Sequence, residues 1–242
     1  MEWRDEGVII GVRGHGETSA IAEILTAEHG RCLGMVRGGR SRSMRPVLQP
    51  GNLVLITWRA RLEDHLGVFQ LEPLALKAGF ILSHPFRLAG LSTLMAMAQT
   101  LPEREPHSKL YHAAHVVLSS IEDDALWPAL LVRWEMGLLE ELGFGLDLSK
   151  CAATGGAENL DYVSPRTGRA VSRAAGLPYH DRLFALPAFL RGGGELVAGD
   201  VLAGLKLTGY FLERHVFTPR ALAMPAARQW LADGLVQRAQ AC

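Results

Sequence analysis

A change of periodicity near residue 80 limits the folds open to this chain more than any other feature. Beyond it, apolar residues recur at helical spacing over 86–101, 108–121 and 123–143. Before it, short runs have the alternating or β-branched character of strands, at 6–13, 18–27, 32–36, 52–59 and 68–75. The run 18–27 also fits a helix, but the turn signal at 28–30 favours a strand. The pattern predicts an α+β chain with domains at 1–79 and 80–242.

Five short strands within about seventy-five residues favour a small closed or partly open barrel. Oligonucleotide-binding (OB) folds use this architecture, with long loops around the binding face. The sequence therefore predicts an N-terminal five-stranded OB-fold barrel followed by an all-helical C-terminal domain. Between about residues 147 and 178, glycine and proline replace the periodicity, which predicts an irregular insert or a small strand pair. Helices are expected again over 181–190, 200–215 and 225–235.

The segment RGGRSRSMR joins two of the expected strands and carries no carboxylate. Its glycines permit positive φ and its serines compete for backbone hydrogen bonds, so neither a helix nor a strand should continue through it. The chain as a whole has 25 basic and 25 acidic side chains, so only the local distribution of charge is informative. A planar guanidinium suits phosphate oxygens. We predict a phosphate-binding loop rather than a merely solvated one, with the side chains of Arg37, Arg40, Arg42 and Arg45.

Further candidates lie near this loop in the predicted barrel. Arg59 and Arg61 follow the strand 52–59, and Arg13 precedes a glycine turn. Trp58 is a candidate for stacking on an unpaired base, although an aromatic residue in a strand is more often part of the core. Nothing resembles a recognition helix or a zinc finger, so binding should involve the nucleic-acid backbone rather than specific bases.

Known catalytic motifs are absent from the sequence. There is no G-x-S-x-G elbow and no phosphate loop, and Ser19 stands where the dinucleotide motif that begins at Gly14 and Gly16 needs its third glycine. His112 and His115 have helical spacing but lack the glutamate of a metalloprotease pattern. We therefore predict that the chain is not an enzyme.

Cellular location is predicted from the cysteines and the N-terminus. Cys32, Cys151 and Cys242 are widely separated, which argues against a disulfide scaffold and fits a reducing cytosol. The N-terminus is acidic where a secretory signal would be basic, and no apolar run is long enough to span a bilayer. We expect a soluble, cytoplasmic protein with no membrane partner.

The order of these features resembles the bacterial RecO family of DNA repair and recombination mediators. The resemblance covers nearly the whole chain and rests on the segments GETSAIAEILTAEHGRC, MVRGGRSRSMRPVLQPGN, RWEMGLLEELGFGLDLSKC, YVSPRTGRAVS and YFLERHV. It implies binding of single- and double-stranded DNA, strand annealing, and assistance in loading a recombinase onto strands coated by single-strand-binding protein (SSB). An RNA- or ribosome-associated OB-fold protein remains the alternative.

The resemblance also implies partners and a nucleoid-associated location in the bacterial cytoplasm. The partners are the C-terminal tail of SSB, the mediator RecR and, indirectly, the RecA recombinase. Arg133 lies between Val132 and Trp134 on an otherwise apolar helix. Either it is an arginine that extends to solvent from the edge of the core, or, as the resemblance suggests, it binds the terminal carboxylate of the SSB tail.

The predicted insert departs from the family in its cysteines. Many members carry a four-cysteine zinc site there, whereas this chain keeps Cys151, has Thr154 at the second position, and has Ser172 and Ala175 at the second pair. One thiolate with two hydroxyls cannot make the closed tetrahedral site of structural zinc. We therefore predict that the chain has no zinc and needs no cofactor.

Overall fold

The computed structural model describes residues 1–62, 64–193, 196 and 199–241. The chain divides into two compact units, Met1–Glu122 and Asp123–Cys242. The domain limits predicted from the sequence, 1–79 and 80–242, were placed where strands give way to helices. They remain a prediction.

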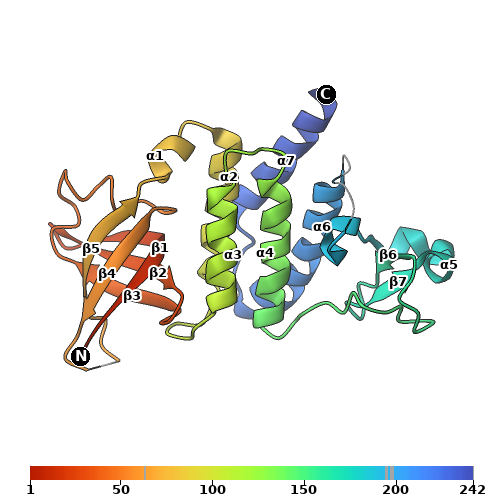
Figure 1. The fold of residues 1–242 in the computed structure, drawn as a ribbon, viewed down its shortest axis with the longest axis horizontal. Helices are drawn as coiled ribbons and strands as arrows, with labels where there is room; N and C mark the ends of the chain where they lie inside the picture. Colours follow the sequence, from red (N-terminus) through yellow and green to blue (C-terminus); the bar gives the residue numbers. More distant parts are fainter. Residues whose placement is uncertain (63, 194–195, 197–198, 242) are drawn as a thin grey trace. The chain divides into compact units, whose positions relative to one another are not determined.

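The first unit begins with five strands, red to orange in Figure 1. They close a barrel in the order β1-β2-β3-β5-β4, in which only the β3–β5 pairing, at Met35 and Val68, is parallel. This arrangement confirms the predicted OB-fold barrel and the α+β class. The strands are β1 (Glu2–His15), β2 (Ser19–Thr26), β3 (Arg31–Val36), β4 (Leu53–Arg59) and β5 (Val68–Ala75).

The barrel core follows from side-chain alternation. β3 and β4 bury every second residue, so one side of each strand faces inward. Ile9, Ile24 and Ile56 are fully buried in this core. At Gly34, a Cβ would approach the ring of Phe69 to 2.5 Å, so β3 can pass this ring only without a side chain.

Helices of the same unit cover the outside of β1 and β2. Val8 and Ile10 are buried although they flank the inward-facing Ile9. The side-chain amide of Gln99 donates to the Ile10 carbonyl at 3.2 Å, and the hydroxyl of Ser108 donates to the Ala27 carbonyl at 2.6 Å. These contacts tie the barrel to the helical segment that follows it, which contains α1 (Ala78–Ile81), α2 (Pro85–Ala98) and α3 (Ser108–Ser119).

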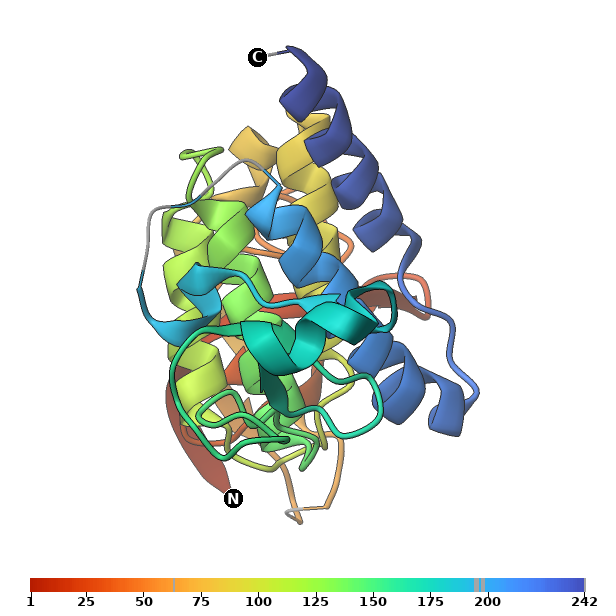
Figure 2. The ribbon, with the colours of Figure 1, turned by 90° about the vertical axis from the view of Figure 1, so that its right-hand side faces the viewer.

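The second unit is built on packed helices. α4 (Trp127–Glu141) contacts α6 (Asp200–Leu212), as Figure 2 shows in green and light blue, and α6 also contacts α7 (Ala226–Ala241). α6 continues as a π-helical turn, Glu213–Phe217, and a 3₁₀ turn, Thr218–Arg220. Within the described part of the chain, no helix is both long and apolar enough to cross a membrane.

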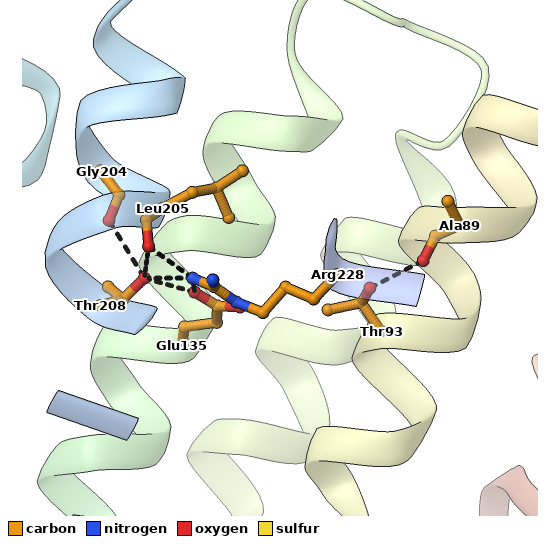
Figure 3. Close-up of polar contacts among 7 residues, drawn as sticks. All are labelled: Ala89, Thr93, Glu135, Gly204, Leu205, Thr208 and Arg228. Atoms are coloured by element: carbon orange, nitrogen blue, oxygen red, sulfur yellow. Dashed lines mark hydrogen bonds and ion pairs between the residues drawn. The ribbon is translucent and has the colours of Figure 1, made fainter. Parts of the chain in front are cut away.

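A buried ion pair connects the three helices of this unit (Figure 3). Glu135 on α4 is fully buried, and Arg228 on α7 donates to its two oxygens at 2.8 and 2.9 Å. Arg228 also donates to the Leu205 carbonyl at 2.6 Å, and the hydroxyl of Thr208 on α6 donates to Glu135. Burial alone lowers the pKa of Arg228, but the Glu135 carboxylate more than offsets this and the pKa is raised.

The insert contains a small sheet. β6 (Leu160–Val163), β7 (Ala170–Ser172) and β8 (Phe184–Ala185) form it in the order β7-β6-β8, and the short helix α5 (Arg173–Gly176) follows β7. The helix predicted over 181–190 is wrong, because β8 and the 3₁₀ turns Leu177–Arg182 and Ala188–Arg191 occupy this region. Pro187 has extended backbone angles, and a proline disfavours a helix at the residue before it. The residues before Pro187 pair with strand β6 instead.

Candidate nucleic-acid interface

The arginine loop leaves β3 as a series of turns, as its glycines and serines predicted. Gly38 has φ +65°, the amide of Gly39 donates to the Val36 carbonyl, and the amide of Ser41 donates to the Gly38 carbonyl. All four loop arginines are exposed. The loop therefore directs their guanidinium groups into solvent, where a phosphate can reach them.

Two anchors hold this loop to the barrel. Val47 and Leu48, just after the last arginine, are buried in the barrel core. Arg40 donates through its guanidinium to the Gly16 carbonyl at 2.9 Å and through its amide to the Thr18 carbonyl at 3.0 Å. The loop is thus fixed against the β1–β2 turn, and a ligand need not order it on binding.

A hollow of about 450 Å³ lies between the loop and this turn. Two of the four loop arginines, Arg40 and Arg45, line it together with three glycines. A Cβ at Gly14 would contact nothing within 4 Å, so the space beside it is open. The lining residues are Val12, Gly14, Gly16, Ala20, Gly39, Arg40, Arg45, Leu48 and Gln49. A sugar–phosphate backbone can approach closely here because glycines present only main chain.

Sequence reasoning missed the glycines and Gln49 of this groove. The one available signal was the Gly14-His15-Gly16 turn, which the sequence offered as an incomplete dinucleotide motif and as the turn after Arg13, but not as part of the site itself. Arg13 is exposed, but it alternates along β1 with Val12 and Gly14. Because successive strand residues point to opposite faces, Arg13 points away from the groove that its neighbours line.

Arg59 and Arg61 lie at a second hollow, of about 610 Å³, with Met35 and Val68 among its lining residues. Strand pairing places this second hollow near the start of the arginine loop. Arg59 pairs with Val68, and Val68 pairs with Met35, which lies two positions before Arg37. Arg59 is also bonded to Glu2 at 2.8 Å. That hydrogen bond lowers the pKa of Glu2, and the carboxylate offsets the charge of Arg59. Arg59 therefore contributes less positive potential than its sequence suggests.

Trp58 belongs to the barrel core and not to a stacking surface. It is 4% exposed, and its indole N–H donates to the Leu66 carbonyl at 3.2 Å. A Cβ at Gly67 would come within 2.1 Å of the indole nitrogen, so the chain closes tightly over the ring. A base cannot reach this ring without opening the core, and Trp58 is therefore left out of the proposed interface.

In the second unit, Arg133 is exposed on α4 and lines a cavity of about 580 Å³. The other lining residues are largely apolar or small, with Glu140 and Asp147 as the acidic members: Met136, Gly137, Glu140, Gly145, Leu146, Asp147, Leu148 and Leu190. A cation beside apolar walls has the chemistry to hold an apolar group that ends in a carboxylate.

The insert holds Cys151 with hydrogen bonds. The amide of Ser172 donates to its sulfur at 3.2 Å, and the hydroxyl of Ser172 lies 3.4 Å from it. Burial raises the pKa of the Cys151 thiol, but hydrogen bonds from Ser172 and Thr154 outweigh this and lower it to about 6. These hydroxyls stand where a zinc site would need thiolates, so the residues do not fit a structural zinc ion.

The absence of zinc stays a prediction, which metal analysis of purified protein can test. We expect far less than one zinc per chain after dialysis, and unchanged thermal unfolding after incubation with a chelator. One tightly held zinc per chain, lost together with thermal stability on chelation, would contradict it.

Two family models match the chain. The model for the N-terminal part of recombination protein O covers residues 1–75, and the model for its C-terminal part covers residues 82–222. The chain belongs to the RecO family. Among relatives named DNA repair protein RecO, that of Methylobacterium nodulans is 53% identical over 95% of this chain and 96% of its own length. The relative from Agrobacterium fabrum is 53% identical over 99% of this chain and 93% of its own length.

RecO family membership gives the chain a role in DNA repair and recombination. The family comprises repair mediators and not catalysts, in agreement with the prediction that this chain is not an enzyme. The family models span the barrel with its arginine loop and the segment that contains Arg133.

Proposed function

We propose that the chain binds single- and double-stranded DNA through the loop Arg37–Arg45, anneals complementary strands, and assists recombinase loading on SSB-coated single strands. One observation carries the proposal: four exposed arginines lie on a loop that the core residues Val47 and Leu48 anchor beside an open glycine groove. The family supplies the repair context.

Annealing by such a surface needs neither a cofactor nor a nucleotide. Two complementary strands repel each other through their phosphates, and cations that bind one strand reduce this repulsion toward the second. Guanidinium groups bind phosphate bidentately and leave the base edges free to pair. The surface therefore raises the local concentration of pairing strands without reading their sequence.

Protein partners complete the proposal. The Arg133 cavity is our proposed site for the acidic, phenylalanine-ended tail of SSB, supported by the exposed guanidinium beside Met136, Leu146 and Leu148. RecR and, indirectly, RecA are the other proposed partners, in the bacterial cytoplasm at the nucleoid.

Strand annealing tests the nucleic-acid part directly. Replacing the four loop arginines by alanine should slow annealing of complementary oligonucleotides about tenfold or more, with or without SSB, because electrostatic acceleration of association has that size. A matched control removes exposed arginines of the second unit and should anneal at close to the wild-type rate, with alanine at Arg166, Arg182, Arg214 and Arg220. Equal rates for both variants would contradict the assignment of the loop. Stronger competition by RNA than by DNA of equal length would favour an RNA-associated function.

The tail site has its own prediction. Arg133→Ala should weaken binding of a labelled SSB tail peptide about tenfold or more, because a charge-assisted hydrogen bond to the terminal carboxylate is lost. Fluorescence anisotropy measures this, with Arg182→Ala as the control from the same unit. The salt dependence of DNA binding should not change in Arg133→Ala. Undiminished affinity for the tail would refute the role of Arg133.

A further inference from the structure

The end of β5 and the helix α1 present an apolar patch to solvent. Four large side chains within residues 74–82 are about half exposed: Leu74 at 46%, Leu76 at 49%, Phe80 at 47% and Leu82 at 54%. Single exposed apolar residues are ordinary on soluble proteins, but four within nine successive positions form a group of the kind that marks interaction surfaces.

The backbone beneath this patch is fixed. Ala78 and Ile81 of α1 are buried, and the Ala78 amide donates to the side-chain oxygen of Asn52 at 3.0 Å. Asn52 is itself fully buried, and its side-chain amide donates to the carbonyls of Pro46 and Val47. Burial of these α1 residues leaves Phe80 and Leu82 outside, so their exposure does not result from a frayed end.

The sequence around α1 is basic. Between Glu72 and Glu103 the sequence has no aspartate or glutamate, and its ionisable residues are Lys77, His84 and Arg87. The guanidinium of Arg87 lies 5.5 Å from the centroid of the Phe80 ring. The ammonium of Lys77 donates to neutral acceptors, the Leu118 carbonyl at 3.2 Å and the Ser119 hydroxyl at 3.4 Å.

Arg87 and Glu72, at the edges of the patch, also have polar partners. Arg87 donates to the backbone carbonyl of Glu122 at 2.9 Å. On the strand side, Glu72 lies 3.8 Å from Arg4 in an exposed ion pair. The patch therefore combines apolar contact area with a positive rim on the α1 side.

We propose that this surface, which we call the α1 patch and define as Leu74, Leu76, Lys77, Phe80, Leu82 and Arg87, docks a short acidic segment with apolar side chains from a partner protein. Apolar groups of the segment cover the leucines and the Phe80 ring, which has the character of an interface anchor, and its carboxylates meet the cations. The proposal does not depend on the function of the arginine loop.

Other occupants fit less well. Leucines offer no flat face for stacking with bases, which disfavours a nucleic-acid strand. A second copy of this chain, paired through the same patch, would bring the same cations together in a symmetric interface. Charge complementarity thus favours an acidic peptide.

A panel of fluorescein-labelled peptides of about a dozen residues tests this, with leucine or phenylalanine at varied spacing among aspartates. We expect members of the panel to bind the full chain and binding to weaken with salt. The double variant Leu76→Ser/Phe80→Ser should lose about tenfold or more in affinity. Val116→Ser is the control, because Val116 is 52% exposed on α3 of the same unit, and it should bind as the wild type does.

Three results of the peptide experiment would overturn the proposal. The first is no binding by any member of the panel, and the second is equal binding of peptides in which lysine replaces every aspartate. The third is equal binding by the Leu76→Ser/Phe80→Ser variant with an unchanged far-ultraviolet circular dichroism spectrum. Light scattering adds one more check, because a dimer that this variant abolishes would assign the patch to self-association instead.

Discussion

Replacing Glu135 by alanine should lower the free energy of unfolding of the second unit by about 3–5 kcal/mol, the usual cost of breaking a buried ion pair from one side. The loss is large because Arg228 keeps its charge while only 11% of its side chain is exposed. Without Glu135, the partners that the guanidinium retains among the described residues are the Leu205 carbonyl and the Thr208 hydroxyl, which are neutral. Urea unfolding followed by circular dichroism measures the change.

Two further variants show whether the loss comes from the unpaired charge of Arg228 or from removing the Glu135 side chain itself. Glu135→Leu combined with Arg228→Met replaces both charges by apolar groups and should recover much of the loss, because no buried charge is then left unpaired. Arg182→Ala removes an arginine from an exposed ion pair of the same unit and should change the unfolding midpoint little. If Glu135→Ala unfolds at the midpoint of Arg182→Ala, the buried network does not stabilise the unit.

The barrel was predictable because its information is local. Each strand carries its own alternation or β-branched run, and turn residues separate the strands, so 68–75 was found with its observed limits. The ion pair of Glu135 and Arg228 was not predictable, because the two residues are 93 positions apart and no pattern in the sequence links them. Its existence depends on how α4, α6 and α7 pack.

The candidate site shows the same division. The arginines of the loop are visible in the sequence, whereas the groove beside them arises from the approach of the β1–β2 turn to that loop. Trp58 is of a residue type that can stack on bases, but closure of the barrel buries its side chain. Arg59 looked free in the sequence, yet strand pairing brings Glu2 opposite to it. Sequence identified charge and residue type, and pairing across the barrel decided which of them remain accessible.

The loop arginines should set the salt dependence of DNA binding. If the four guanidinium groups each neutralise one phosphate of single-stranded DNA, the logarithm of affinity should fall against the logarithm of salt with a slope of about −3, from about −0.7 per phosphate. A fourfold increase in salt should then weaken binding about fiftyfold. Titrations of a labelled oligonucleotide at several salt concentrations, followed by anisotropy, give this slope.

Substitutions within the barrel can resolve which cations contribute. Each single alanine variant at Arg37, Arg42 or Arg45 should reduce the steepness of the slope by about 0.7. The variant in which alanine replaces all four loop arginines should lose nearly all of the loop's contribution to the slope. Arg40 bonds a neutral carbonyl, so its charge still acts, but Arg40→Ala also frees the loop and should weaken binding beyond its share of the slope. Arg13→Ala is the matched control on β1, since its side chain points away from the groove, and it should change the slope less than any loop arginine. If the variant without all four loop arginines keeps both the wild-type slope and the wild-type affinity, the loop is excluded from the binding site. A wild-type slope with lower affinity would indicate instead that the loop shapes the groove without contacting phosphates.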